Sequence, residues 1–165
     1  TPSLKNILRL IYKTYTGNLE DINEILKNIE KEKFKILPPN KIFKSWKSQG
    51  VMLLNVCLTV SAEKTGEYYD LWIPFIRELL EYISAKNNSI VYFIWGKDSE
   101  VFEKSILSGD IIKHGHPAIC GKLENEKDFL NGISFKNTAN IINWTGYEEE
   151  IKYPGKDKKY RETLF

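Results

Sequence analysis

The sequence contains few cysteines, no long apolar run and no strong excess of charge of one sign. Its 2 cysteines, Cys57 and Cys120, form no Cys-x-x-Cys pair, which argues against a disulfide framework and against a zinc site. No apolar run reaches the roughly 18 residues of a membrane span, and the first residues lack the basic and apolar regions of a signal peptide. The net charge of +2 is far below the basic excess of a general DNA-coating protein. We therefore expect a soluble intracellular protein without a membrane contact, in the nucleus, the cytoplasm or a viral factory.

Size and composition favour one folded domain. A chain of 165 residues fits a single core, and its 42% hydrophobic and 13% aromatic residues exclude disorder of the whole chain. The composition changes at residue 148, because the segment 148–165 is rich in charge and tyrosine. We expect a domain over 1–147 and, over 148–165, a charged, solvated tail rather than a DNA-binding arm.

Helical and strand patterns alternate along the chain. Apolar residues recur at helical spacing in six stretches, namely 3–17 with Ser3 as the cap, 18–35, 41–48, 69–83, 101–107 and 128–142. Continuous apolar runs predict buried strands at 51–56, at 90–95 and from 111 onward. The alternation predicts an α/β fold of three layers, α/β/α, around a short central parallel sheet, with ligands gathering where the strands end. Asn55, Gly96 and His116 follow these predicted strand ends.

Asn55 and His116 are the two residues with the chemistry of a binding site. The Asn55 amide donates one hydrogen bond and accepts another, which reading a base edge requires, yet an asparagine after an apolar run is also a common turn former. The proline after His116 gives the histidine a rigid presentation, but a lone histidine is more often structural than catalytic. Taken alone, each residue therefore favours the structural interpretation.

Six short motifs then occur in a specific order. They are Pro2-Ser3-Leu4-Lys5-Asn6-Ile7, the block from Trp46 through Gln49-Gly50-Val51-Met52-Leu53-Leu54-Asn55 to Val60, Trp72-x-x-Phe75, Trp95-Gly96, His116-Pro117 and Ile142-Asn143-Trp144. The block that ends at Val60 is too long for a chance match. Over residues 2 to 144, the set resembles the family 1 uracil-DNA glycosylases.

The resemblance implies a role for individual residues. Asn55 matches the asparagine that reads the uracil edge, and His116 matches the histidine that donates to the uracil carbonyl oxygen as the base departs. The residues that contact DNA would lie in three loops, formed by Pro2 and Ser3, by Gly96 and Lys97, and by Pro117, Ala118, Ile119 and Cys120. Hydrolysis of this kind requires no metal and no cofactor.

The chain also departs from the family pattern. The family's Gln-Asp-Pro-Tyr-His motif, which positions the attacking water, does not occur in these residues, nor does the first strand of the family sheet. Lys97 replaces a serine, either Ile119 or Cys120 must replace the leucine wedge, and 18–40 is an insertion. Two sheet edges would lack the strand between them. We therefore expect that these residues are part of a longer enzyme and that they are inactive on their own.

The leading hypothesis is a DNA repair enzyme of base excision repair, a hydrolase that flips uracil out of single- or double-stranded DNA and cleaves its N-glycosidic bond. The alternative is a catalytically inactive glycosylase-like module that binds DNA or assists replication. A general nucleotide-binding domain is disfavoured, because no glycine-rich phosphate loop follows a predicted strand. We expect a monomer, with an inhibitor protein or a replication protein as candidate partners besides DNA.

Overall fold

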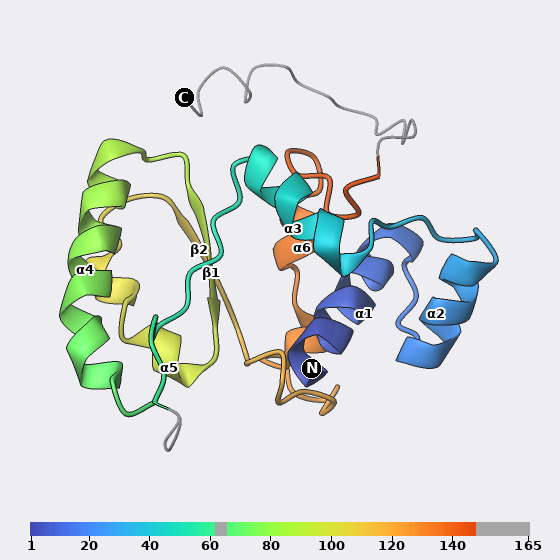
Figure 1. Ribbon diagram of the computed structural model, residues 1–165, viewed down its shortest axis with the longest axis horizontal. Helices are drawn as coiled ribbons and strands as arrows, with labels where there is room; N and C mark the ends of the chain where they lie inside the picture. The colour runs from blue at the N-terminus through green and yellow to red at the C-terminus, as the bar shows by residue number, and fades with distance from the viewer. Residues whose placement is uncertain (62–65, 148–165) are drawn as a thin grey trace. The chain divides into compact units, whose positions relative to one another are not determined.

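The computed structural model describes residues 1–61 and 66–147, and its contacts divide the chain into two compact units (Figure 1). The first unit combines Thr1–Met52 with the residues from Gly115 onward, and the second unit is Leu53–His114. The tail predicted for 148–165 lies outside the described residues. The first unit is therefore built from two segments that are distant in sequence.

The three helices predicted at the start of the first unit are confirmed. They are α1 (Pro2–Thr16), α2 (Ile22–Glu30) and α3 (Pro39–Ser48). The expected cap of α1 is wrong, because Thr1 rather than Ser3 accepts a hydrogen bond from the Leu4 N–H, at 3.5 Å. Pro2 takes the first helical position, where a missing N–H costs nothing, and this moves the cap to the residue before it.

The single long helix predicted over 128–142 is also wrong. The segment forms a 3-10 helix, η2 (Phe129–Asn131), and a short α-helix, α6 (Ser134–Thr138). Gly132 separates the two with an extended backbone, φ −62° and ψ 149°, and glycine is among the residues least favourable to a continuous helix. The apolar residues still enter the core, since Phe129, Leu130 and Phe135 are at most 1% exposed.

Trp46 and Trp144 join the two segments of the first unit. Their rings meet edge to face with centroids 5.4 Å apart, and the Trp46 Nε1–H donates to the Trp144 carbonyl oxygen at 3.0 Å. The Trp144 Nε1–H donates to Thr138 Oγ1 at 3.0 Å, so both buried indoles have acceptors. Beside them, the Gln49 side chain binds the backbone N–H and carbonyl of Asn143 at 2.7 and 3.1 Å. These four motif residues, Trp46, Gln49, Asn143 and Trp144, therefore have structural roles.

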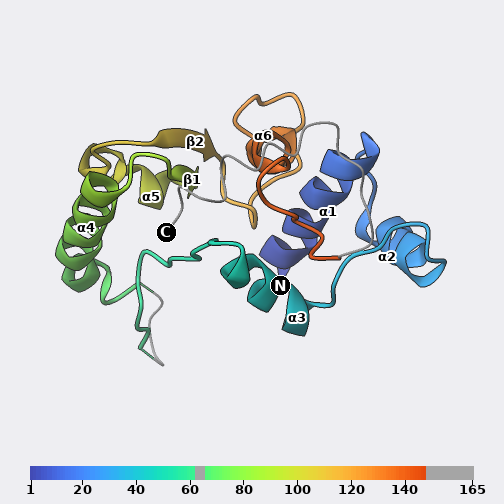
Figure 2. The same ribbon diagram turned by 90° about the horizontal axis from the view of Figure 1, so that it is seen from above.

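The second unit is a small mixed structure of helix and strand. Strands β1 (Val91–Trp95) and β2 (Asp110–His114) pair in parallel, from Val91 opposite Asp110 to Trp95 opposite His114. Helix α4 (Tyr69–Lys86) runs beside the strands in both views (Figures 1 and 2). The predicted α/β class is confirmed, with a small open sheet of two parallel strands.

The helix predicted over 101–107 is wrong, because only a three-residue 3-10 helix forms within this span. Helix α5 (Lys97–Glu100) precedes the 3-10 helix η1 (Glu103–Ser105) between the two strands. Phe102, between these helices, forms a buried cluster with Ile76 and Leu80 of α4. None of the helices in the described parts of the chain is long and apolar enough to cross a membrane.

The strand predicted at 51–56 does not form. A strand is defined by a ladder of hydrogen bonds to a neighbour, and among residues 1–61 and 66–147 no strand pairs with this segment. Its apolar side chains are still used, because Leu54 and Val56 pack, partly buried, against the cluster of α4 and Phe102. Apolarity therefore predicts the packing of this segment correctly, whereas strand pairing depends on a partner.

Replacing Trp144 should destabilise the first unit. Trp144→Ala removes a side chain that is 4% exposed, together with its hydrogen bond to Thr138, and we expect the free energy of unfolding to fall by about 3–5 kcal/mol. Chemical denaturation measures the change. The control is Leu71→Ala on α4, where the side chain is 70% exposed and the expected loss is within about 0.5 kcal/mol. Equal losses in both variants would contradict a central role for Trp144.

Candidate functional site

The loop that carries His116 belongs to the first unit and follows β2 directly. Its base is closed where the Gly115 N–H donates to the Lys127 carbonyl at 2.6 Å. A turn follows, in which the Ile119 N–H donates to the His116 carbonyl at 2.9 Å. His116 is exposed on this turn, and Pro117 after it is buried. The loop is thus anchored through its proline and presents the histidine outward.

One hydrogen bond determines which nitrogen of His116 carries the proton. The Ala118 backbone N–H donates to His116 Nδ1 at 3.1 Å. An imidazole nitrogen that accepts a hydrogen bond holds no proton, so this contact favours the tautomer that carries its proton on Nε2. The exposed ring can therefore donate one hydrogen bond through Nε2.

Asp128 holds the far side of the same loop. Its Oδ2 accepts from the Gly121 and Lys122 N–H groups, each at 2.8 Å, and its Oδ1 accepts from the Leu130 N–H at 2.9 Å. The side chain is only 7% exposed, and hydrogen bonds to an ionised acceptor are stronger than neutral ones. One carboxylate therefore joins the end of the His116 loop to the start of η2.

Ile119 and Cys120, the two candidates for the wedge, differ sharply in exposure. Ile119 is 82% exposed, whereas Cys120 is half-buried and its thiol donates to the Pro117 carbonyl at 3.4 Å. Burial raises the pKa of the Cys120 thiol, and the charge of Asp128 raises it further, so the thiol is protonated at neutral pH. The most accessible apolar side chain at this turn is that of Ile119.

The first turn of α1 is joined to the His116 loop by one side chain. The Asn6 amide Nδ2 donates to the Pro117 carbonyl at 2.8 Å. Pro2 and Ser3 stand on the same turn of α1, where Pro2 is exposed and Ser3 half-buried. Two of the three predicted DNA-contacting loops thus lie within the first unit and share a hydrogen bond.

The remaining predicted residues, Asn55, Gly96 and Lys97, belong to the second unit. Gly96 follows β1 with φ 89°, a left-handed conformation that favours glycine, and its N–H donates to the His114 carbonyl at 2.9 Å. Lys97 is exposed at the start of α5. Asn55 is exposed, and its amide makes no hydrogen bond with the described residues. That Asn55 and His116 meet in one pocket stays a prediction.

The second histidine, His114, occupies a different environment from His116. It ends β2 opposite Trp95 and is half-buried. Burial lowers the pKa of His114 below its ordinary value, because the charged imidazolium loses hydration. In the part of the chain that the structure describes, no group of three His, Cys, Asp or Glu residues is placed to hold a metal ion.

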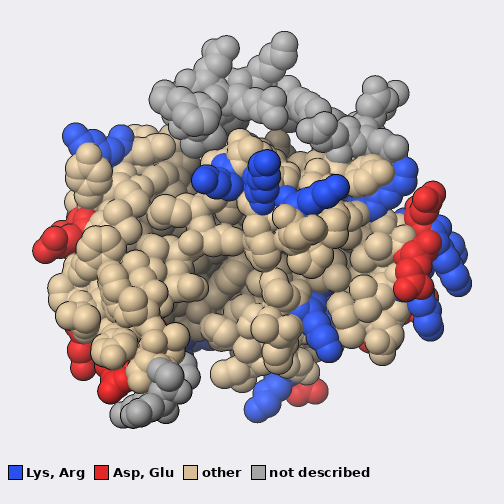
Figure 3. All heavy atoms as spheres, viewed as in Figure 1, with Lys and Arg blue, Asp and Glu red and all other residues tan. Residues whose placement is uncertain are grey.

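Basic side chains gather over α3 in the space-filling view (Figure 3). Lys41, Lys44 and Lys47 are exposed on this helix, which contains no acidic residue. None of the predicted site residues lies on α3. A row of this kind is typical of a solvated helix face.

Curated proteins match this chain over most of its length. The uracil-DNA glycosylase of Lachnoclostridium phytofermentans is 29% identical over 136 residues, which is 78% of this chain and 59% of the relative. That of Pseudomonas aeruginosa PAO1 is 27% identical over 128 residues, or 76% of this chain and 54% of the relative. That of Streptococcus pyogenes serotype M49 is 30% identical over 105 residues, which is 62% of this chain and 47% of the relative. No family model matches the chain.

These similarities place the chain among relatives of DNA glycosylases, and the fold of the chain itself is mixed α/β. More specifically, the chain is related to the uracil-DNA glycosylase family, as the motifs indicate. The chain spans about half the length of the curated relatives it matches.

Sequence reasoning missed three groups that organise this site. The Ala118 N–H is a backbone group and leaves no signal in the sequence. Asn6 lies inside a motif already noted, but its partner Pro117 is 111 residues away. Asp128 could have been identified, because an aspartate just before an apolar pair is typical of a helix cap.

Removing the Asp128 carboxylate should loosen the loop. In Asp128→Ala three backbone N–H groups lose their acceptor, and we expect the free energy of unfolding to fall by about 2–4 kcal/mol. Denaturant unfolding measures the loss. Glu126→Ala is the matched control, because Glu126 is an exposed carboxylate on the same loop. An Asp128→Ala protein as stable as this control would refute the anchoring role.

Proposed function

We propose that the protein to which this chain belongs is a DNA repair glycosylase that hydrolyses the N-glycosidic bond of uracil in DNA. The observation that carries the proposal is the hydrogen bond from the Ala118 N–H to His116 Nδ1, which leaves Nε2–H of an exposed ring as a donor. The relatives named uracil-DNA glycosylase support the same activity. Residues 1–147 would then form part of a glycosylase domain, with 18–40 as an insertion.

The chemistry requires a donor of this kind. When the bond between sugar and base breaks, positive charge develops on the sugar and uracil departs as an anion. A hydrogen bond aimed at the uracil carbonyl oxygen stabilises that developing charge more than it stabilises the bound substrate, and so lowers the barrier. With its proton on Nε2, His116 can donate this hydrogen bond directly.

The proposal gives the other predicted residues their roles. The exposed Asn55 amide would read the uracil edge, which presents both a donor and an acceptor. Lys97 and the first turn of α1 at Pro2 and Ser3 would contact backbone phosphates and hold the flipped nucleotide. The Ile119 side chain, which is 82% exposed, would enter the base stack in place of the displaced base.

The group that positions the attacking water is proposed to lie upstream of Thr1, and residues 1–165 alone would be inactive. The alternative is a catalytically inactive glycosylase-like module that binds DNA or assists replication. The departures from the family motifs are the reason to consider this alternative. A Gln-Asp-Pro-Tyr-His motif encoded upstream would favour the enzyme. The proposed substrate is uracil in single- or double-stranded DNA, and the proposed state is a monomer.

Loss of the His116 donor should slow bond cleavage rather than binding. For the protein with its upstream segment, His116→Ala should lower the single-turnover rate of uracil release by about 10²–10³-fold, the usual loss for one donor to a developing anion. Binding to a uracil-containing oligonucleotide should change much less, and serves as the control. Binding with no uracil release by the unaltered protein would instead favour the accessory module.

Shortening Ile119 should affect duplex DNA selectively. Flipping a base out of a duplex costs a few kcal/mol, whereas an unpaired base needs little flipping energy. We expect Ile119→Ala to lower uracil release from duplex by about 10-fold and to leave single-stranded substrate nearly unaffected. The matched control is Cys120→Ala, because the Cys120 thiol turns inward to Pro117. A larger duplex defect in Cys120→Ala would assign the wedge to Cys120 instead.

A further inference from the structure

We propose that Asn6 and Arg9 of α1 are positioning residues for His116, acting through the peptide group between Pro117 and Ala118. The two ends of this peptide bind different partners. Its carbonyl oxygen accepts from Asn6 Nδ2 at 2.8 Å, and its N–H donates to His116 Nδ1 at 3.1 Å. Because a peptide group is planar, turning the carbonyl turns the N–H with it. Asn6 therefore controls the contact that assigns the proton of His116.

Arg9 determines which end of the Asn6 amide faces the loop. Its Nη1 donates to Asn6 Oδ1 at 3.2 Å, and its Nε donates to the Glu20 carbonyl at 2.9 Å. An amide has one accepting oxygen and one donating nitrogen, so an arginine on the oxygen leaves the NH₂ group for Pro117. The chain of contacts thus runs from Glu20 through Arg9 and Asn6 to the peptide.

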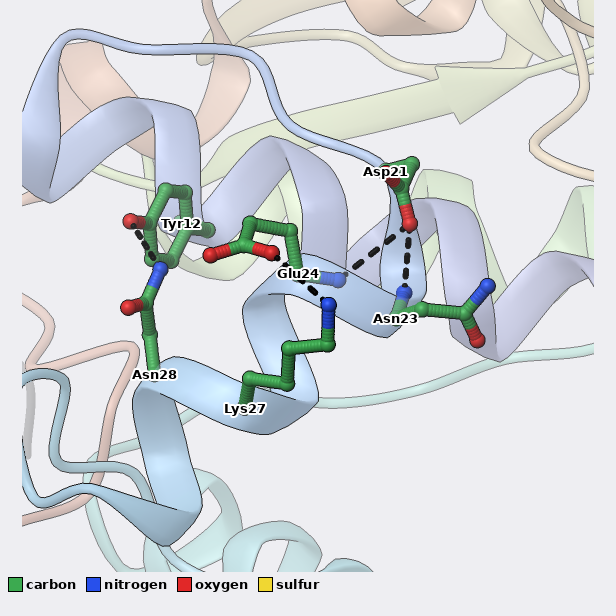
Figure 4. A network of polar contacts seen from close by, with 6 residues as sticks. All are labelled: Tyr12, Asp21, Asn23, Glu24, Lys27 and Asn28. Carbon is green, nitrogen blue, oxygen red and sulfur yellow. Dashed lines mark hydrogen bonds and ion pairs between the residues drawn. The ribbon is translucent and has the colours of Figure 1, made fainter.

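This series of hydrogen bonds begins in the segment 18–40, which the motifs predict to be an insertion. Glu20 immediately precedes Asp21, whose carboxylate caps α2 by accepting from the Asn23 and Glu24 N–H groups at 2.7 and 3.2 Å (Figure 4). The α2 helix is in turn tied to α1, where Asn28 Nδ2 donates to Tyr12 Oη at 3.0 Å (Figure 4). The insertion therefore supplies a fixed carbonyl that orients Arg9.

Hydrogen bonds in series also strengthen one another. Donors on the Pro117 carbonyl, from Asn6 and more weakly from the Cys120 thiol, polarise the peptide and make the Ala118 N–H a better donor. A better donor at Nδ1 favours the ring form with its proton on Nε2. The inserted segment is thereby coupled to the form of His116 that the proposed function uses.

The direct test observes the imidazole nitrogens by NMR at about pH 8, above the ordinary histidine pKa of about 6.5. Asn6→Asp replaces the donor with a carboxylate that repels the Pro117 carbonyl, so the proton of His116 should redistribute and its Nδ1 signal should move toward that of a protonated nitrogen. The sequence has 2 histidines, and the signals of His114 should stay in place. The control is Asn23→Asp, the same exchange at an exposed position of α2.

A second variant separates this coupling from a folding defect. Arg9→Lys keeps the charge and keeps Asn6 but loses the planar group that donates to two acceptors at once, so a smaller shift of the same His116 signal is expected. If the Asn6→Asp protein does not fold, the Arg9→Lys protein alone tests the coupling to His116. Folded variants that leave the His116 signals unchanged would overturn the proposal.

The kinetic consequence rests on the proposed function and is measured in the protein with its upstream segment. Asn6→Asp should lower the single-turnover rate of uracil release by about 3- to 10-fold, as expected for one hydrogen bond, and should have no effect in a His116→Ala background. An equal loss in both backgrounds would mean that Asn6 acts otherwise than through His116. If the unaltered protein releases no uracil, the proposed function fails, while the NMR result still decides the coupling.

Discussion

The packing of Trp144 against Trp46 is the constraint on which the first unit depends. That unit is assembled from residues 1–52 and from the chain that begins at Gly115, and residues 53–114 between them form the second unit. The two indoles, the Gln49 contacts to Asn143 and a hydrogen bond of 2.9 Å from the Trp144 N–H to Tyr15 Oη close this discontinuous core. Without them, ordering the return segment would cost chain entropy with little burial to offset it.

This closure has a direct consequence for chemistry, because the His116 loop lies on the return segment while Asn6 and Arg9 lie on α1. The hydrogen bond from Asn6 to Pro117 spans 111 residues of sequence, so it exists only when both segments are folded together. The buried Pro117 and the buried Asp128 fix the loop on two sides, and the ring of His116 stays exposed between them. In the proposed function, a donor held in this way needs little reorganisation when it meets an anion, which is how preorganised donors stabilise developing charge.

In the second unit, an apolar pattern alone does not determine whether a segment forms a strand. Residues 90–95 are apolar, and Val91–Trp95 of them form β1, because β2 lies beside them as a partner. Residues 51–56 are equally apolar, yet among the described residues they have no partner strand and bury only some of their side chains. Apolar composition measures the gain from burial, whereas a strand also needs a neighbour for its N–H and carbonyl groups.

The sequence by itself determined the helices α1 to α4, the two parallel strands and the family relationship, because these depend on local periodicity and on the order of motifs. It identified His116 and Ile119 as residues of interest but assigned no proton to the ring and left Ile119 and Cys120 as equal candidates. The tertiary structure adds a backbone donor at His116 Nδ1 and separates Ile119 from Cys120 by exposure. The proton of His116 depends on a backbone N–H, and the exposure of Ile119 depends on how Cys120 turns inward to Pro117. Such contacts have no sequence signature, because one partner in each is a backbone group and the folded chain decides which backbone group it is.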